Sequence, residues 1–171
     1  FWQNLGCPKE FNLIELGAGN GEMMKVLVDT FDKFPIFKNS CRIKILERSK
    51  LLKKKQKVNI NKKNIQWLND LRELDNLPCI FLANEFFDAL PIKQFIKKER
   101  KWFEKHVRFF KNKFEYFDVP FDMKKFENKI KFKIAKQQDF IEYSPQSTEY
   151  LKSINNKIKR NNGGILIIDY A

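Results

Sequence analysis

The stretch FNLIELGAGNGEMM, residues 11–24, constrains the fold of this chain more than any other feature. Its first six residues form a short, mostly apolar run, which is typical of a buried β-strand. Gly17, Gly19 and Gly21 then follow at alternate positions, and apolar residues at helical spacing come next. An ordinary tight turn needs one glycine, so three in register indicate a strand–turn–helix unit whose backbone passes close to a ligand.

The same alternation of apolar runs and helical patterns continues to residue 86. We expect β-strands at residues 11–16, 41–47, 64–68 and 78–86. A helix is expected from Asn20 to about Phe34, stopped by Pro35, and a second, basic helix should be capped by Ser49. A weak helical turn follows around residues 71–74. This spacing predicts an α/β fold of βαβ units, with a parallel sheet covered by helices on both faces.

The rhythm changes after the fourth strand. Between Ile92 and Val119, aromatic and β-branched residues alternate with charged ones, which predicts an antiparallel β-meander broken at KKERK and KNK. Residues 120–135 are ambiguous. Beyond them we expect a short strand at 139–145, a helix over 145–160 and a fifth apolar core strand at 165–171. We interpret residues 1–171 as one domain with a β-rich insertion at about 92–119.

The composition leaves the nature of the partners open. The formal net charge is +13, which could indicate nucleic acid or an anionic membrane surface as a partner, but the lysines are scattered along the whole chain, and we favour AT-rich codon usage as their cause. Three widely spaced cysteines indicate reduced thiols, and the single histidine argues against multi-histidine metal sites; we expect no metal. No run approaches the roughly 18 apolar residues of a membrane span, so we expect an intracellular, reducing compartment.

The glycine turn excludes two common nucleotide sites. A dinucleotide-binding turn needs a third glycine at position 22, where this chain has Glu22, whose charge would oppose a pyrophosphate. A P-loop needs Gly-Lys-Ser/Thr, which does not follow. The remaining pattern, an acid at Glu15 and then alternate glycines at 17, 19 and 21, is typical of class I S-adenosylmethionine-dependent methyltransferases.

Three acids near strand ends are candidate cofactor ligands. Glu15 would lie near the cationic end of S-adenosylmethionine, where charge-assisted contacts are strong. Glu47, at the end of the second strand, is placed to accept both ribose hydroxyls, although an acid after a strand is often simply solvated. Asp70 follows the third strand and is a weaker candidate for the adenine amino group.

The segment LANEFFDALP, residues 82–91, supplies candidate transfer residues. Ligands of open parallel sheets bind outside the carboxyl ends of the strands, where Asn84, Glu85 and Asp88 should lie. Asn84 is also a candidate cofactor ligand, and Phe86-Phe87 could close the site against water. Asn84 as a turn cap and Asp88 as a helix cap are the structural alternatives.

Six motifs in order make the chain resemble the MidA-like methyltransferases: ELGAGNGEMM, ILERSKLLKKKQ, ANEFFDALPIKQF, W-x-E-x-x-V at 102–107, IEYSP and GGILIIDYA. The family includes a mitochondrial complex I assembly factor. The resemblance implies a Rossmann-like domain that uses S-adenosylmethionine to methylate a protein arginine, in the bacterial cytoplasm or the mitochondrial matrix, with a complex I subunit as one conceivable acceptor.

The chain departs from the family at its ends. Ala171 stands where a glycine is expected after Asp-Tyr, and the family extends further on both sides. Because the chain also opens without Met, we expect an excised or partial domain.

An arginine acceptor needs carboxylates that orient its guanidinium, and Glu85 and Asp88 are the first candidates, with Glu142 a third. Two other functions stay open: an RNA or DNA amino-methyltransferase, although Asn84-Glu85-Phe86-Phe87 lacks that class's two prolines, and a non-catalytic assembly factor. The role of the meander at 92–119 also stays open. We favour a half-buried sheet that could dock a protein acceptor over a base-stacking surface for nucleic acid.

Overall fold

The computed structural model describes residues 1–62 and 64–170, which divide into two compact units. Unit 1 contains Phe1–Ala89 and the chain from Ser147 onward, and unit 2 contains Leu90–Gln146. Unit 2 is longer than the predicted meander, because a helix and a further strand belong to it. Among the described residues, no helix combines the length and apolarity that crossing a membrane requires.

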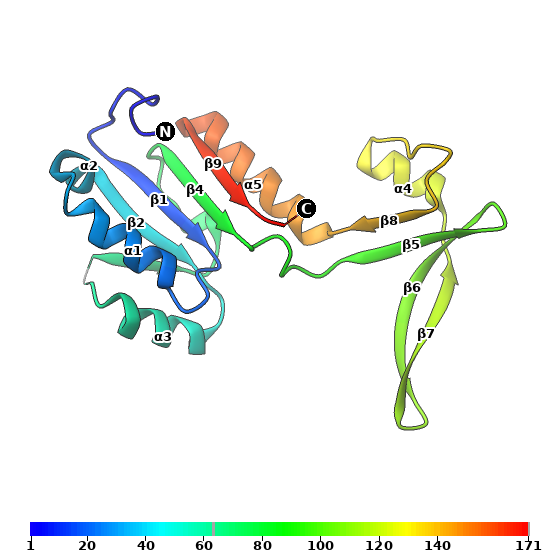
Figure 1. Cartoon of the computed structure of the whole chain (residues 1–171). Coiled ribbons are helices and arrows are strands. Elements are labelled where there is room, and N and C mark those ends of the chain that lie inside the picture. Colours follow the sequence, from blue (N-terminus) through cyan, green and yellow to red (C-terminus); the bar gives the residue numbers. More distant parts are fainter. Residues whose placement is uncertain (63, 171) are drawn as a thin grey trace. The chain divides into compact units, whose positions relative to one another are not determined.

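Unit 1 is built on a five-stranded parallel sheet in the order β3-β2-β1-β4-β9 (Figure 1). The strands are β1 (Phe11–Leu16), β2 (Cys41–Leu46), β3 (Ile65–Leu68), β4 (Cys79–Asn84) and β9 (Gly163–Ile168). The chain order reverses between β1 and β4, which is the switch point where open α/β sheets bind ligands. This arrangement confirms the expected Rossmann-like sheet.

Helices cover both faces of the sheet, as the sequence predicted. The apolar side chains of α1 (Glu22–Phe31), α2 (Pro35–Ser40) and α3 (Lys50–Ile60) pack on one face, around Leu13, Met24 and Ile45. The 3₁₀ turn η1 (Leu71–Glu73) and α5 (Pro145–Asn161) cover the other.

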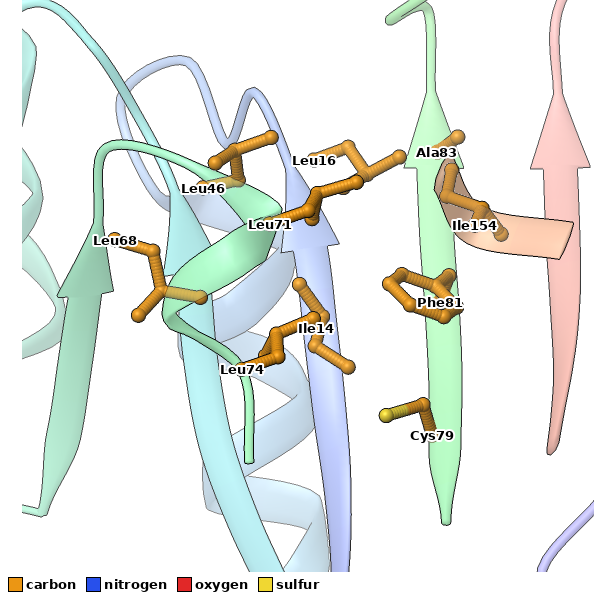
Figure 2. Packing of buried hydrophobic residues seen from close by; sticks show 10 residues of the cluster. All are labelled: Ile14, Leu16, Leu46, Leu68, Leu71, Leu74, Cys79, Phe81, Ala83 and Ile154. Atoms are coloured by element: carbon orange, nitrogen blue, oxygen red, sulfur yellow. The ribbon is translucent and has the colours of Figure 1, made fainter. Parts of the chain in front are cut away.

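Figure 2 shows how that second face is filled. Leu71 and Leu74 reach from the η1 segment toward β1, and Ile154 of α5 lies near Ala83 of β4. Successive residues of a strand point to opposite faces, so a strand flanked by others and covered on both sides is buried along its whole length. All six residues of β1 are buried accordingly.

The first helix differs from the prediction. It begins at Glu22, after Gly21, and ends at Phe31. Pro35 does not stop it but opens α2, where proline occupies the first turn. Proline suits that position because the first turn leaves its N–H groups unpaired in any helix.

The last strand also differs from the predicted core strand at 165–171. β9 ends at Ile168, and the expected boundary at Ala171 lies outside the described residues. Within the described residues β9 pairs with β4 alone, so it is an edge strand. Leu166, Ile167 and Ile168 are therefore 44–47% exposed, in spite of their apolar character.

Unit 2 contains a four-stranded antiparallel sheet in the order β7-β6-β5-β8. Its elements are β5 (Lys93–Lys98), β6 (Lys101–Phe110), β7 (Lys113–Pro120), α4 (Met123–Ile130) and β8 (Phe140–Tyr143). The hairpin turns at 99–100 and 111–112 have positive φ at both residues, as two-residue hairpins require, and fall at the predicted KKERK and KNK breaks. Met123 and Phe126 of α4 pack on Phe95, which gives the unit its own small core.

Candidate cofactor and transfer site

The glycine turn leaves β1 in a left-handed conformation. Gly17, Gly19 and Gly21 have φ values of 64°, 53° and 86°, a region that other residues enter only at a cost. The Gly17 amide donates to the carbonyl of Leu46, 3.0 Å away on β2, and the Gly21 amide donates to Ala18 over 2.7 Å. The turn is therefore held both within itself and against the neighbouring strand.

The three glycines differ in what surrounds them. A Cβ at Gly17 would lie 2.8 Å from the Phe86 ring, and one at Gly21 would lie 3.0 Å from Ile60. A Cβ at Gly19 would meet nothing within 4 Å. Packing thus demands the first and third glycines, whereas Gly19 borders open space in which a ligand could approach the backbone.

Glu15 lies at the end of β1 and is only 3% exposed. Its Oε2 atom is buried without a hydrogen-bond partner, and burial raises the pKa of the carboxyl group to about 7. A buried acceptor without a donor is costly in a folded protein. Glu15 is therefore placed to accept from a cationic or N–H-bearing ligand, and its role as a cofactor ligand stays a prediction.

Glu47 follows β2 and is buried, with both carboxylate oxygens held by the protein. Oε1 accepts from the Ser49 amide over 2.8 Å, and Oε2 accepts from Nε2 of Gln56 over 3.1 Å. Each oxygen of an ionised carboxylate can accept a second bond, so the group stays available for a pair of hydroxyls in a fixed orientation.

Gln56 is a site residue that the sequence interpretation did not find. Its side chain is fully buried on α3, and Nε2 also donates to the carbonyl of Gly19 over 2.9 Å. The indole N–H of Trp67 donates to Gln56 Oε1 over 2.9 Å, which fixes the amide orientation. Gln56 shares the helical phase of the apolar Leu52 and Ile60, and a glutamine at such a position is the signal that could have revealed it.

Asp70 has a local role in the structure. It caps η1 by accepting from the Arg72 amide, and it pairs with the Arg72 guanidinium at 2.9 Å. The side-chain hydrogen bond from Arg72 is the main cause that lowers the pKa of Asp70. Its contact with adenine stays a prediction.

The fourth strand brings part of the predicted transfer group together. Asn84 is the last residue of β4, and Glu85 follows with a φ of 51°, its amide donating to the Ile168 carbonyl over 2.8 Å. Carboxylate oxygens of Glu85, Asp88 and Asp169 lie within 4.8 Å of one another. Asp169 was not predicted as a site residue. The signal was its place after the apolar run of β9, at the same edge of the parallel sheet as Asn84.

Burial and the neighbouring carboxyl groups raise the pKa values of Glu85 and Asp88 in this acidic group. Partial burial raises the pKa of Glu85, and the charges of Asp169 and Asp88 add to that effect. The pKa of Asp88 is raised by burial, by the charge of Asp169 and by a hydrogen bond between the two carboxyl groups. Such a cluster holds protons more tightly than separate acids and attracts a cation. Exposed acids of this kind are common without an ion, and we assign no metal to them.

Three further predicted residues are Glu142, Phe86 and Phe87. Glu142 belongs to β8 in unit 2, where Oε1 accepts from Nε2 of Gln94 over 2.8 Å. Phe86 packs edge-on against Phe87 and Tyr150, with ring centroids 5.3 and 5.1 Å apart, beside Gly17. That Phe86 and Phe87 shield the site from water stays a prediction.

Comparisons with known proteins identify the family of this chain. Residues 1–171 match the family described as "Putative S-adenosyl-L-methionine-dependent methyltransferase". The chain belongs to this family. Among curated proteins it is similar to "Protein arginine methyltransferase NDUFAF7, mitochondrial" of Xenopus tropicalis, with 24% identity over 99% of this chain and 45% of the relative. The human protein of that name is 22% identical over 99% and 44%, respectively. The Caenorhabditis elegans homolog is 27% identical over 98% and 44%.

The chain thus spans a little under half the length of these relatives. Among solved structures it is similar to a "likely methyl transferase" from Burkholderia thailandensis bound to S-adenosyl-homocysteine. The TM-score is 0.69 at 19% identity, covering 89% of this chain and 40% of that one. A native crystal structure of an uncharacterized protein from the same organism gives a TM-score of 0.70 at the same identity. These likenesses establish that the fold is shared.

Proposed function

We propose that this chain binds S-adenosylmethionine and transfers its methyl group to an arginine side chain of a protein. The observation that carries the proposal is the buried, unpartnered Oε2 of Glu15 on the strand that leads into the glycine turn, where Gly19 borders open space. A ligand that places an ammonium group there donates to the lone acceptor, and one that also offers two hydroxyls matches the fixed carboxylate of Glu47. Membership of the methyltransferase family supports the same ligand.

The glycine turn and its flanking acids would hold this cofactor, as the residues present fit its groups. Glu15 would bind its cationic end, the backbone at Gly19 would contact it, and Glu47 would accept from the ribose hydroxyls. S-adenosylmethionine supplies an electrophilic methyl group on a sulfonium. Holding the two reactants in line is the main contribution that a protein makes to such a transfer, with a gain of about 7–11 kcal/mol for well-oriented groups.

Glu85, Asp88 and Asp169 would bind and orient the acceptor. An arginine guanidinium is always protonated in proteins, and a single planar carboxylate can bind it through two parallel hydrogen bonds. The raised pKa values of Glu85 and Asp88 suit a second task. The methylated guanidinium remains a cation, so one proton leaves the acceptor nitrogen on transfer, and a carboxylate of this group can take it.

A protein acceptor is favoured because the relatives in animals are named protein arginine methyltransferases. The Glu85 carboxylate in the transfer group also favours a cationic acceptor over the neutral amine of a nucleobase. The relatives carry the word mitochondrial in their names, and we propose the mitochondrial matrix or the bacterial cytoplasm as the compartment, with a respiratory complex I subunit as one acceptor to test.

Calorimetric titration tests the cofactor. S-adenosylmethionine and S-adenosylhomocysteine should bind the purified chain, and NAD should not. Tight NAD binding, or no binding of the adenosyl ligands, would refute the cofactor assignment.

A labelled-methyl assay tests the reaction. The chain is incubated with labelled S-adenosylmethionine and either total protein or total RNA, and the labelled residues are identified after hydrolysis. We expect label in methylarginine. Label in RNA would identify the amino-methyltransferase of nucleic acid, and cofactor binding without any transfer would leave a non-catalytic factor.

A further inference from the structure

The hairpin of β6 and β7 extends beyond the rest of the unit 2 sheet. β5 pairs with β6 only over Lys101–Glu104, whereas β6 pairs with β7 as far as Phe110 and Lys113. Residues 105–118 therefore form a two-stranded segment, which we call the aromatic ribbon. The sequence pattern suggested a half-buried sheet, but Val107, Phe109, Phe114 and Tyr116 are all exposed.

The two faces of the aromatic ribbon differ in chemistry. Directly paired residues of antiparallel strands share a face, and successive residues alternate. One face carries His106, Arg108, Phe110, Lys113, Glu115 and Phe117. Here the Arg108 guanidinium pairs with Glu115 at 3.3 Å and lies 5.2 and 5.5 Å from the rings of Phe110 and Phe117.

The opposite face is apolar at its centre. It presents Val107, Phe109, Phe114 and Tyr116, with exposed fractions of 57%, 64%, 78% and 77%. The rings of Phe109 and Phe114 contact each other across the strands, with centroids 5.3 Å apart and planes tilted by 58°. At one end of this face the ammonium group of Lys105 lies 5.5 Å from the Tyr116 ring.

We propose that this apolar face is the interface through which two copies of the chain form a dimer. Four side chains of this size and exposure offer on the order of 500 Å² per copy. Two copies would bury on the order of 1,000 Å², the lower limit for a specific interface. Because the centre carries no charge, packing the face on itself removes no ion from water, and a self-complementary face of this kind suits two-fold symmetry.

The charges of the ribbon disfavour the other occupants. Single-stranded nucleic acid needs cations beside the stacking rings to contact its phosphates. Arg108 and Lys113 lie on the opposite face, where Arg108 is already paired; on the apolar face Lys105 lies at one end, opposite Asp118, whose carboxylate already pairs with Lys98. An acidic protein segment meets the same shortage of cations. A second copy needs none.

The oligomeric state tests the proposal. Light scattering after size-exclusion chromatography and sedimentation equilibrium, over a dilution series of the full chain, should show a reversible dimer. The double variant Phe114→Ser/Tyr116→Ser should raise the dissociation constant on the order of 100-fold or more, because each substitution occurs twice in a symmetric interface. Phe110→Ser, on the neighbouring strand β6 and on the other face of the ribbon, should leave the dimer unchanged.

Circular dichroism confirms that each variant is folded, and Phe109→Lys provides an independent disruption of the same face. A monomeric wild type at every concentration would overturn the proposal. So would a dimer that persists in both Phe109→Lys and the double variant, or one that Phe110→Ser dissociates as readily. A monomer that binds a labelled single-stranded RNA, and loses it in the double variant, would assign the face to nucleic acid instead. The outcome does not depend on methyl transfer.

Discussion

At the scale of single residues, Glu15 links the stability of the ligand-free chain to ligand binding. Its carboxyl pKa is raised by burial from 4.5 to about 7. Without a ligand, the contribution of this group to stability is fully present below pH 4.5 and is lost as the pH rises to about 7, because the unfolded chain ionises first. The loss amounts to about 3 kcal/mol at most.

We therefore expect Glu15→Gln to stabilise the ligand-free chain above pH 7 and to weaken cofactor binding. In the wild type, affinity for S-adenosylmethionine should rise with pH and level off above about 7, since a cationic ligand requires the ionised carboxylate. Calorimetry and urea unfolding across this pH range measure both effects. Glu22→Gln, at an exposed acid in the first turn of α1, is the matched control. A pH-independent affinity in the wild type would contradict the role of Glu15.

Asp75 contacts two buried polar side chains of the parallel sheet, Asn12 of β1 and Lys44 of β2. It accepts from Asn12 over 2.5 Å and from the ammonium of Lys44 over 3.1 Å, and the Lys44 side chain is only 6% exposed. Asp75→Ala would leave that ammonium buried without its carboxylate, and we expect a loss of about 2 kcal/mol in unfolding free energy, reduced from the fully buried case by the partial exposure of Asp75.

Lys44→Met removes the cation itself and should cost less, and adding Asp75→Ala to it should cost little more. Burial alone would raise the pKa of Asp75, but the hydrogen bonds from Asn12 and Lys44 and the charge of Lys44 together lower it from 3.8. Its stabilisation should therefore be present above about pH 4 and be lost as the pH falls through the lowered value. Equal costs for the two single variants in urea unfolding would show that no buried cation is left unpaired.

At the scale of elements, the glycine turn separates packing from ligand binding. Gly17→Ala would bring a methyl group 2.8 Å from the Phe86 ring at a positive φ, so it should destabilise the fold. Gly19→Ala meets no atom within 4 Å and should cost only the strain of a left-handed residue, about 1–2 kcal/mol. Yet its methyl group would occupy the space beside the proposed cofactor.

We expect Gly19→Ala to lose at least tenfold in S-adenosylhomocysteine affinity, while its melting temperature falls by only about 2–8 °C. Thermal unfolding and calorimetry on the two variants measure this split. Unchanged affinity in folded Gly19→Ala would show that no ligand lies against this turn.

Helix α3 makes a comparable contribution through Gln56. Replacing it with Leu removes the donor to the Gly19 carbonyl and to Glu47, and leaves the Trp67 N–H without its acceptor. Because buried groups left unpaired cost about 1–3 kcal/mol each, we expect weaker adenosyl binding together with lower stability. Trp67→Phe removes only the hydrogen bond from the Trp67 indole to Gln56 Oε1 and should retain more affinity for the adenosyl ligand. Similar affinities for both variants and the wild type would leave Gln56 with a packing role alone.

Most of these elements were predicted from local sequence signals. Features that depend on contacts between distant parts of the chain were not, because a local pattern carries no information about them. The β1 run, the Ser49 cap and the two hairpin breaks depend on neighbours within a few residues. Gln56 and Asp169 acquire their roles from residues far along the chain. The exposure of β9 likewise follows from its place at the sheet edge, which an apolar pattern cannot distinguish from a central strand.

At the scale of the whole molecule, the proposed cofactor and transfer residues all belong to one of the two units. Every proposed cofactor ligand and Glu85, Asp88 and Asp169 belong to unit 1, whereas unit 2 has its own core around Phe95. Within unit 1, the ring contact between Phe86 and Tyr150 brings the segment before unit 2 close to the segment after it. A short linker can therefore join these segments without disturbing the parallel sheet.

We expect a chain in which a short Gly/Ser linker replaces residues 90–143 to fold and to bind S-adenosylhomocysteine as the full chain does. Pro145 then stays in the first turn of α5, and Ser144 precedes it. If unit 2 docks the acceptor, methyl transfer to protein should fall while cofactor affinity holds, and calorimetry with the labelled-methyl assay separates the two. The same deletion should abolish dimer formation, since it removes the aromatic ribbon. A shortened chain that fails to fold, when the full chain folds, would show instead that residues 1–171 form one inseparable domain.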